Sequence, residues 1–272
     1  ATGCYPDRTR ANLKVQEGCD CFCSYCIVPH ARGRPRSREW NDVLREAKTL
    51  AARGHKEIVL TGVNIACYDD HGRTLPDLLQ ALLQLPGDFR IRLSSTEPSA
   101  QLPRLLEVMR GSPRICRFLH LPIQHGADSV LQRMNRTYTV AEYARFANQA
   151  VAAIPGLCLG SDVIVGFPGE SDGEFETCRE SIARLPLAYL HVFRYSRRPG
   201  TPAAGFPDQV HGGVAAKRHR ALTQLGKEKA ATFATGQVGC TVTVLTEKQD
   251  DAGHWEGWSD NYLRVSLNGS RR

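Results

Sequence analysis

The sequence predicts an α/β protein: a parallel, partly closed barrel of six strand and helix units, (β/α)6, followed by a small, incomplete all-β barrel. Two observations predict the first part: strand-like and helix-like segments alternate along most of the chain, and polar motifs follow the strands where they end. A change to short strand-like segments after residue 238 predicts the second part. Barrels of this kind carry their active sites at the carboxyl ends of the strands.

The six strands of the predicted barrel are short apolar runs. They cover 13–16, 58–60, 89–95, a stretch closed by 120–126, 157–165 and 187–193. The fifth run is almost continuously apolar, as expected of a parallel strand that is buried on both faces.

Helices are predicted between these strands from apolar residues at helical spacing and from start signals. We expect them near 39–52, from Thr74 onward, at 103–110, from Thr139 to 152 and from Ser171 onward. Glu142 completes a capping box with Thr139, and Glu174 completes another with Ser171. A basic helix is expected over 210–235, and strands follow at 240–247, 254–259 and 262–267.

Composition narrows the class of protein. The chain has 272 residues, 42% of them hydrophobic, and no apolar run reaches the 18 residues of a membrane span. Ten cysteines without a signal peptide indicate a reducing compartment, so we expect a soluble, cytoplasmic protein that does not bind membranes. A formal net charge of +7 favours an anionic partner, of which nucleic acid is the commonest.

Cysteines at C-x3-C-x2-C spacing, Cys19, Cys23 and Cys26, follow the first strand on a loop. An iron-sulfur cube usually takes four cysteine ligands, so three would leave one iron open. A structural zinc site with Cys21 or His30 as fourth ligand is the alternative, although no second cysteine pair follows. Disulfides between cysteines this close would be strained. Spacing alone leaves the cluster and the zinc site open.

A resemblance favours the cluster. The run Cys19, Cys23, Tyr25 and Cys26 resembles the radical S-adenosylmethionine signature, in which an aromatic residue precedes the third cysteine. The flanks KVQEGC and CIVPHARGRPRSR resemble the methylthiotransferase branch of that superfamily. Further similar segments are TGVN (61–64), LSSTEP (93–98), HLPIQHG (120–126), DVIVGFPGE (162–170), HVFRYSRRPGTPA (191–203) and SDNYLRV (259–265).

The resemblance implies a [4Fe-4S] cluster on the three cysteines, with S-adenosylmethionine on the open iron as the source of a 5′-deoxyadenosyl radical. It implies cofactor contacts at Tyr25, Gly62, Asn64, Glu97, Gln124, Asp162 and Gly166. Structural roles are the alternative: Gly62 could only permit a turn, Glu97 could be a surface ion-pair partner, and Gln124 and Asp162 could satisfy backbone groups. No acid/base triad is expected.

The implied activity is that of a tRNA methylthiotransferase. The segments TGVN and SDNYLRV look most like enzymes that methylthiolate N6-threonylcarbamoyladenosine at tRNA position 37. Related branches act on N6-isopentenyladenosine in tRNA or on a ribosomal protein aspartate. An external electron donor of the flavodoxin or ferredoxin type is implied. Non-catalytic RNA-binding modules, with or without zinc, are the competing hypotheses.

The same resemblance divides the chain into domains. Residues 1–10 would be a remnant of an amino-terminal methylthiotransferase domain, 11–236 the radical core, and 237–272 a partial TRAM domain that binds RNA. The family carries a second [4Fe-4S] cluster on three amino-terminal cysteines, of which we find only Cys4, so that cluster has no evident site and we expect a fragment. Cys21 is interpreted as a bystander, and His125 and Arg194 differ from the commoner family residues.

Basic residues form two groups, which we interpret as an RNA footprint that positions the substrate through its phosphates. The first group is Arg32, Arg34, Arg36 and Arg38, and the second is Arg194, Arg197, Arg198, Lys217, Arg218, Arg220, Lys227 and Lys229. The target base would have to leave its stack to reach a buried radical. The remaining cysteines are expected to be small core residues: Cys67, Cys116, Cys158, Cys178 and Cys240.

Overall fold

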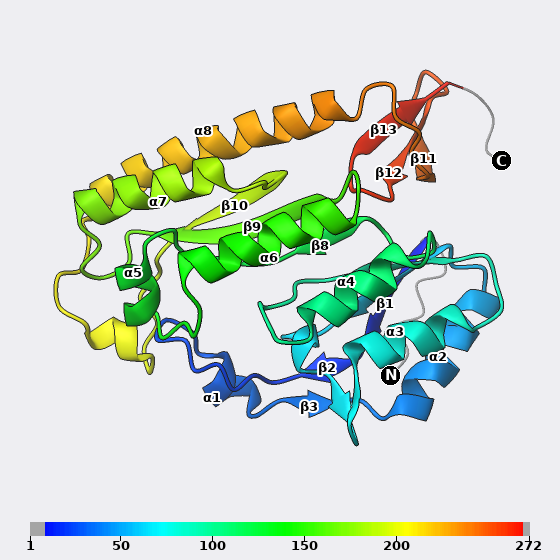
Figure 1. The fold of residues 1–272 in the computed structure, drawn as a ribbon, viewed down its shortest axis with the longest axis horizontal. Helices are drawn as coiled ribbons and strands as arrows, with labels where there is room; N and C mark the ends of the chain where they lie inside the picture. The colour runs from blue at the N-terminus through cyan, green and yellow to red at the C-terminus, as the bar shows by residue number, and fades with distance from the viewer. Residues whose placement is uncertain (1–8, 269–272) are drawn as a thin grey trace.

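The computed structural model describes residues 9–268, so Cys4 and most of the predicted amino-terminal remnant lie outside the described residues. Six parallel strands form the body of the molecule (Figure 1). They are β1 (Arg10–Lys14), β4 (Glu57–Thr61), β7 (Arg90–Leu93), β8 (Phe118–His120), β9 (Cys158–Val165) and β10 (Tyr189–Arg194).

The strands follow one another in the order β1-β4-β7 and β8-β9-β10. The two halves are joined where the Thr96 N–H donates to the His120 carbonyl over 2.9 Å, beside a parallel bridge between Ser95 and His120. Within the described residues β1 and β10 do not pair with each other, so the barrel is open. The predicted parallel, partly closed barrel is therefore confirmed.

Helices cover the outer side of the strands. The long ones are α2 (Trp40–Ala52), α3 (Leu75–Leu83), α4 (Leu102–Arg110), α6 (Val140–Ala153), α7 (Asp172–Arg184) and α8 (Gly212–Gly236). Both predicted capping boxes are formed: the Thr139 N–H donates to Glu142 over 2.8 Å, and the Ser171 N–H donates to Glu174 over 2.9 Å. Figure 1 shows α8, in orange, running beside α7 along β10.

Several short elements were not predicted. They are α1 (Val28–Arg32), α5 (Asp128–Arg133), the 3₁₀ turns η1 (Ile65–Cys67) and η2 (Pro202–Gly205), and the two-residue strands β2 (Gln16–Glu17), β3 (Arg36–Ser37), β5 (Asp69–Asp70) and β6 (Arg73–Thr74). The first barrel strand lies earlier than the predicted 13–16, because Gln16 leaves it to pair with Ser37. The fourth ends at His120, and the predicted 120–126 stretch is irregular beyond it.

Alternate residues of each strand face opposite ways. Leu60, Leu119 and Val163 point outward into the large apolar core, where they meet helix residues such as Leu78 and Leu105. Such alternation places the other set of side chains on the concave inner face. That set includes the charged and polar side chains of Glu57, Arg92, His120 and Asp162. A barrel with a polar inner face is suited to holding a polar ligand rather than to being filled by core packing.

The carboxyl-terminal segment forms a three-stranded antiparallel sheet of β11 (Val244–Gln249), β12 (Trp255–Ser259) and β13 (Arg264–Leu267). The turn after β12, which contains the DNY of SDNYLRV, docks against the barrel: Arg117 pairs with Asp260 over 2.6 Å. Asn261 donates to the Gly156 carbonyl over 3.2 Å, and Tyr262 packs its ring 4.5 Å from that of Phe118. This segment therefore has a structural role in docking the sheet.

A buried network of charged residues lies between the barrel strands and the carboxyl-terminal sheet. The Glu57 carboxylate, with no exposed side-chain surface, accepts hydrogen bonds from Arg90 and Arg92 over 2.6 to 3.0 Å. The same guanidinium groups donate to carbonyls of the sheet: Arg90 Nη2 donates to Trp258 over 2.9 Å, and Arg92 Nη2, which also donates to Glu57, donates to Ser259 over 3.0 Å. One carboxylate thus organises the contact between barrel and sheet.

Among the described residues, no helix is both long enough and apolar enough to cross a membrane.

Candidate functional site

The loop with the three cysteines connects β2 to α1 and is tightly constrained at its start. Gly18 has φ +76°, and a Cβ there would lie 2.1 Å from the Arg34 carbonyl oxygen. The Cys19 N–H donates to the Gly33 carbonyl over 3.1 Å. Only glycine fits at position 18, because the backbone that follows α1 closes directly on it.

The end of α5 holds the middle of the same loop. Ser24 donates through its N–H to the Met134 carbonyl over 3.0 Å and through its hydroxyl to the Arg133 carbonyl over 2.8 Å. The Asn135 amide donates to the Phe22 carbonyl over 2.9 Å. The loop is thus held from both sides by contacts within the protein, although α5 was missed from the sequence.

The thiols of the loop are in different electrostatic environments. Hydrogen bonds from the Cys21 side chain and N–H lower the pKa of Cys19 to about 6 against the effect of burial. Burial raises the pKa of Cys23, although Arg136 opposes this through its Nη1, 3.0 Å from the Cys23 sulfur. Cys26 is partly buried. All three are free thiols, so the disulfide alternative is not realised.

The spacing of the sulfur atoms bears on the zinc alternative. In a tetrahedral zinc site with Zn–S bonds of about 2.3 Å, sulfurs lie about 3.8 Å apart. Within residues 9–268, one set of three ligand atoms from His, Cys, Asp or Glu has all its atoms within 4.8 Å of one another. It belongs to His120, Asp162 and His191. Cys19, Cys21, Cys23 and Cys26 supply no such group. Their sulfurs are therefore spread more widely than one zinc ion requires.

Gln16 connects the cysteine loop to the end of β4. Its side-chain nitrogen donates to the Gly18 carbonyl over 2.7 Å, and its oxygen accepts from the Asn64 N–H over 2.8 Å. Gly62 lets the two segments approach, since a Cβ there would lie 3.0 Å from the Cβ of Gln16. Gln16 was not singled out from the sequence; a polar residue directly after an apolar strand was the available signal.

Asn64 faces the cysteine loop. Its side-chain nitrogen lies 3.1 Å from the Cys67 sulfur and 3.9 Å from that of Cys21. The expectation that Cys67 is a core residue is therefore wrong, because it lies partly exposed beside the loop. Cys240 is exposed, so that expectation is wrong as well.

The expectation for the other three scattered cysteines is correct. Cys116, Cys158 and Cys178 are all buried.

Arg136 joins Glu97 to the loop. Its guanidinium forms an ion pair with the Glu97 carboxylate while it also contacts the Cys23 sulfur. Tyr138 stacks against it with the guanidinium carbon 4.9 Å from the ring centre, and the Tyr138 hydroxyl donates to the Ile123 carbonyl over 3.1 Å. Burial raises the pKa of Glu97, and Arg136 opposes that rise. Glu97 is thus an ion-pair partner beside the cysteines, not on the open surface.

Three further predicted contact residues lie around the end of β9. Gln124, with φ +68°, donates its N–H to the Asp162 carbonyl over 2.9 Å and accepts from the Ile164 N–H over 2.7 Å. Gly166 has φ +73°, and a Cβ there would lie 2.7 Å from that of Ala215.

Tyr25 brings the cysteine loop to the same strand end. Its ring meets Phe167 edge-on with the two centres 6.5 Å apart.

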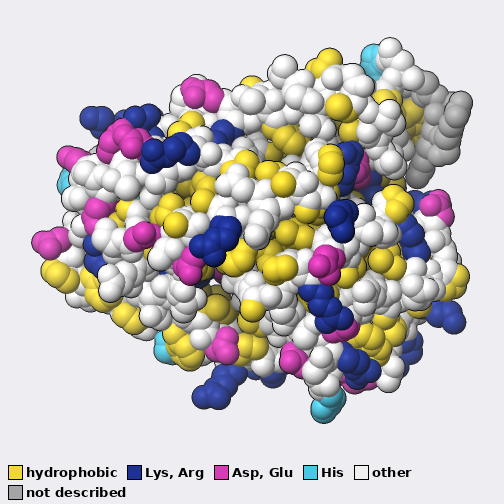
Figure 2. Space-filling view, viewed as in Figure 1, with side chains coloured by type: hydrophobic (Ala, Val, Ile, Leu, Met, Phe, Trp, Pro, Cys, Tyr) yellow, Lys and Arg dark blue, Asp and Glu magenta, His cyan; other side chains and the backbone are white. Residues whose placement is uncertain are grey.

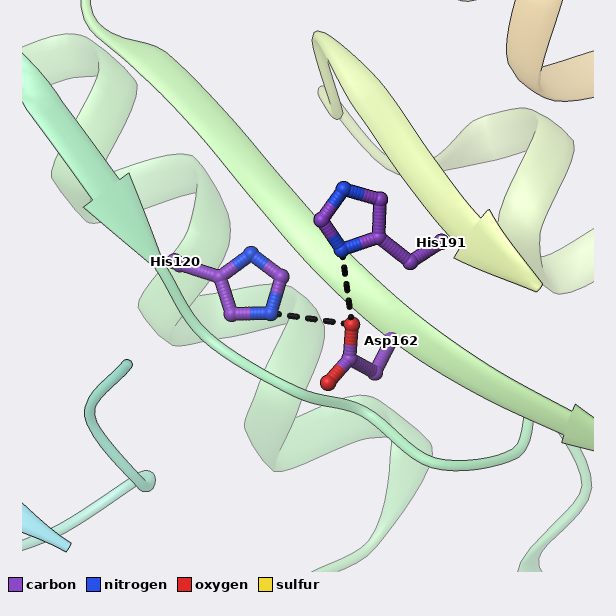
Figure 3. Close-up of side chains that lie close together, drawn as sticks. All are labelled: His120, Asp162 and His191. Atoms are coloured by element: carbon purple, nitrogen blue, oxygen red, sulfur yellow. Dashed lines mark ion pairs between the residues drawn. The ribbon is translucent and has the colours of Figure 1, made fainter. Parts of the chain in front are cut away.

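Three neighbouring strands bring two histidines to one carboxylate (Figure 3). His120 Nε2 lies 3.0 Å and His191 Nδ1 lies 3.2 Å from the same oxygen of Asp162. Burial would raise the pKa of Asp162, but the two imidazoles outweigh it and hold the pKa at about 2. The sequence analysis had selected Asp162 but neither histidine, since their alignment depends on the strand register.

Two residues that differ from the commoner family residues have distinct places. His125 is fully buried; its Nδ1 accepts the Ala127 N–H over 3.1 Å, and Glu170 lies 3.6 Å from its Nε2. His125 is therefore a core residue. Arg194 is exposed at the end of β10.

The basic residues divide into structural and exposed ones. Arg218 is buried and pairs with Asp172 over 2.8 Å, while Lys229 donates to the Leu185 carbonyl over 2.8 Å. Arg38 pairs with Asp42. The other nine of the twelve predicted residues are exposed: Arg32, Arg34, Arg36, Arg194, Arg197, Arg198, Lys217, Arg220 and Lys227. Figure 2 shows basic and acidic side chains interspersed on the face drawn, without a continuous basic band.

Comparisons with known proteins now identify the family. The profile of the radical SAM superfamily matches residues 13–182, so the chain belongs to that superfamily. Within it, the chain is 41% identical over 273 residues to the threonylcarbamoyladenosine tRNA methylthiotransferase MtaB of Bacillus subtilis (strain 168), covering 98% of this chain and 60% of that protein. It is 39% identical to the tRNA-2-methylthio-N(6)-dimethylallyladenosine synthase of Neorickettsia sennetsu, covering 89% of this chain and 52% of that protein.

The chain thus spans about 60% or less of the length of these relatives. Solved structures show the same fold at low sequence identity. The radical S-adenosylmethionine methyltransferase TsrM of Kitasatospora setae matches with a TM-score of 0.61 and 20% identity over 73% of this chain and 39% of that chain. Coproporphyrinogen III oxidase HemN of Escherichia coli matches with a TM-score of 0.53 and 16% identity over 89% of this chain and 55% of that chain.

Proposed function

We propose that Cys19, Cys23 and Cys26 hold a [4Fe-4S] cluster whose fourth iron binds S-adenosylmethionine, in a tRNA methylthiotransferase. The observation that carries the proposal is the cysteine loop itself, which is held at its start and its middle and in which no three of the sulfurs lie within 4.8 Å of one another. Three thiolates at larger separations suit a cube of iron and sulfide. When reduced, such a cluster supplies the electron that splits the sulfonium of S-adenosylmethionine.

The protein's part in this chemistry is to position and shelter the cofactor. The proposed contacts are Tyr25, Gly62, Asn64, Glu97, Gln124, Asp162 and Gly166. Support for part of this set comes from contacts with the cysteine loop: Gln16 joins the loop to Asn64, and Arg136 joins Glu97 to Cys23. Arg136 also offsets the negative charge of thiolates, which favours their deprotonated, metal-binding form.

For the substrate we propose N6-threonylcarbamoyladenosine at tRNA position 37. The 41% identity to the threonylcarbamoyladenosine tRNA methylthiotransferase of Bacillus subtilis supports it, and the 39% identity to a dimethylallyladenosine enzyme makes N6-isopentenyladenosine the second candidate. The exposed basic residues would hold tRNA phosphates. We further propose that 237–272 is a TRAM-like RNA-binding unit attached to a radical core over 11–236.

A second cofactor and a partner protein complete the proposal. A second [4Fe-4S] cluster and an external electron donor of the flavodoxin or ferredoxin type would serve the complete reaction in the cytoplasm.

Cleavage of S-adenosylmethionine tests the catalytic proposal. Protein reconstituted without oxygen with iron and sulfide, then reduced, should release 5′-deoxyadenosine, measured by chromatography and mass spectrometry. Cys23→Ala should abolish release, whereas Cys240→Ala should not change it because that thiol is exposed and distant in sequence from the loop. A colourless protein that binds zinc and forms no 5′-deoxyadenosine would refute the proposal.

RNA binding tests the substrate class separately. Replacing Arg194 and Arg198 with Ala should weaken tRNA binding and reduce the slope of log affinity against log salt by about 1 for each phosphate that the variant no longer binds. Arg179→Ala is the control, since that exposed arginine pairs with Glu176 on α7. An equal effect in both variants would contradict a footprint at the end of β10. Tandem mass spectrometry of nucleosides from treated tRNA then decides between the two modified adenosines.

A further inference from the structure

The inner face of β8, β9 and β10 carries a cluster of ligand-type atoms made by His120, Asp162 and His191. The three residues come from adjacent parallel strands in fixed register: His120 pairs with Gly160, and His191 pairs with Asp162. In Figure 3 both imidazole rings turn toward the same carboxylate oxygen, while the second oxygen points away from both rings. Three donors held by a parallel sheet form a rigid set, unlike donors on a loop.

The contacts within this cluster are close, yet they are not good hydrogen bonds. The Asp162 Oδ1 is buried and has no hydrogen-bond partner of acceptable angle, although a histidine nitrogen lies 3.0 Å away and another 3.2 Å away. A buried carboxylate oxygen without a well-aligned donor is unusual in a folded protein. The Asp162 oxygen and the two histidine nitrogens therefore lie close together without forming well-aligned hydrogen bonds to one another.

These separations match a shared metal ion. Nitrogen and oxygen ligands bind transition metals at about 2.0–2.2 Å, so ligand atoms around one ion lie about 3.0–3.5 Å apart. The two distances to Asp162 fall in that range, and all three ligand atoms lie within 4.8 Å of one another. Two imidazoles and one carboxylate are a donor set that suits zinc and ferrous iron.

The Tyr189 hydroxyl fixes the orientation of His120. The Tyr189 hydroxyl lies 2.7 Å from Nδ1 of His120, on the opposite side of the ring from Asp162. Gly160 makes this possible, because a Cβ there would lie 1.9 Å from the Tyr189 ring. A hydrogen bond to the remote ring nitrogen is the usual support of a metal-binding histidine, since it orients the ring and fixes its tautomer. This contact leaves Nε2 of His120 facing the carboxylate.

We propose that His120, Asp162 and His191 bind one divalent transition metal ion, zinc or ferrous iron, at a site separate from the cysteine loop. Three protein ligands leave further coordination positions for water or for a donor atom of a bound ligand. The His191 side chain is 58% exposed, which gives an ion a path to the site, while His120 at 6% anchors the inner side. The site uses nitrogen and oxygen donors and so differs in chemistry from the cysteines. The second Asp162 oxygen remains for the cofactor contact proposed above.

Zinc binding to the cluster-loaded protein tests the proposal. Protein with its cysteines occupied by iron and sulfide is mixed with one equivalent of Zn²⁺, desalted and analysed for zinc per chain, and its affinity is measured by competition with a chelator. One zinc per chain is expected, with a nitrogen and oxygen shell at about 2.0–2.1 Å by X-ray absorption. A sulfur shell at about 2.3 Å would overturn the proposal, because it would place the ion on cysteines.

Variants separate this site from other histidine and carboxylate pairs. Asp162→Asn and His191→Ala should each weaken zinc binding by more than about 100-fold, and Tyr189→Phe by about 10-fold. His254→Ala is the matched control, since His254 lies 3.1 Å from Asp250 on the surface and should leave affinity unchanged. Unchanged iron content and circular dichroism show that each variant is folded. No zinc retained by the parent protein, or equal retention by Asp162→Asn, would overturn the site.

Discussion

Replacing Glu57 with Gln should destabilise the whole chain and loosen the carboxyl-terminal sheet in particular. The Glu57 carboxylate is fully buried and accepts three hydrogen bonds from two guanidinium groups that are themselves 11% and 4% exposed. Those guanidinium groups, of Arg90 and Arg92, also donate to backbone carbonyls of β12 and the residues around it. The substitution keeps the shape of the side chain but removes its negative charge.

The expected magnitude follows from the hydrogen bonds and the charge that the substitution removes. At least one of the three charge-assisted hydrogen bonds must go, because the amide nitrogen cannot accept, and each is worth about 1.5–3 kcal/mol. Two positive charges are then left in a buried place with no counter-charge from Glu57. Removing one partner of a buried ion pair costs about 3–5 kcal/mol, and we expect a decrease in the free energy of unfolding in that range.

Chemical denaturation measures this decrease, because the free energy of unfolding in water is obtained by linear extrapolation to zero denaturant. Hydrogen exchange of β11 to β13 measures the loosening of the sheet. Asp88→Asn is the control, since Asp88 pairs with Lys56 over 2.7 Å with both side chains exposed, and such pairs contribute about 0–1 kcal/mol. A decrease below about 1 kcal/mol for Glu57→Gln, or unchanged exchange in the sheet, would refute the reasoning.

Three other predictions concern pH, packing and the cysteine loop. Burial would raise the pKa of Glu57, but the two arginines lower the pKa overall. The ionised carboxylate therefore stabilises the fold above about pH 4.3, and this stabilisation is lost as the pH falls through the pKa of the folded state. Because Gln does not titrate, the free energy of unfolding of Glu57→Gln should decrease less steeply with falling pH than that of the parent protein. Gly160→Ala should cost about 1–3 kcal/mol in denaturant titration, because its Cβ would overlap the Tyr189 ring, whereas Gly236→Ala, with open space around it, should not destabilise α8. Arg136→Met should speed iron release to a chelator about 10- to 100-fold, since the variant has no charged donor to the cysteine loop, and an unchanged rate would contradict the role given to this side chain.

The order of strands and helices could be predicted from the sequence because its signals are local. Apolar runs, helical spacing and the capping boxes at Thr139 and Ser171 depend only on neighbouring residues, and they located the six strands and most of the long helices. Element ends were less accurate where tertiary contacts decide them. Gln16, for example, leaves β1 because it pairs with Ser37 across the cysteine loop.

The site could be predicted only in part, for a physical reason. The cysteine spacing is visible in the sequence, but Arg136 reaches Cys23 across 113 positions, and no local pattern signals such a contact. His120 and His191 meet on Asp162 only because three strands align in one register. Some charges assigned to RNA binding, such as Arg218, prove to be structural because partners from distant segments bury them.

The most direct test of the account is the electron paramagnetic resonance spectrum of the reduced, reconstituted protein with and without S-adenosylmethionine. We predict four iron and four sulfide per chain and a spectrum that changes when S-adenosylmethionine is added, because the cofactor binds the iron that Cys19, Cys23 and Cys26 leave open. A spectrum that does not respond, or a protein that holds zinc on these cysteines in place of iron, would contradict the account.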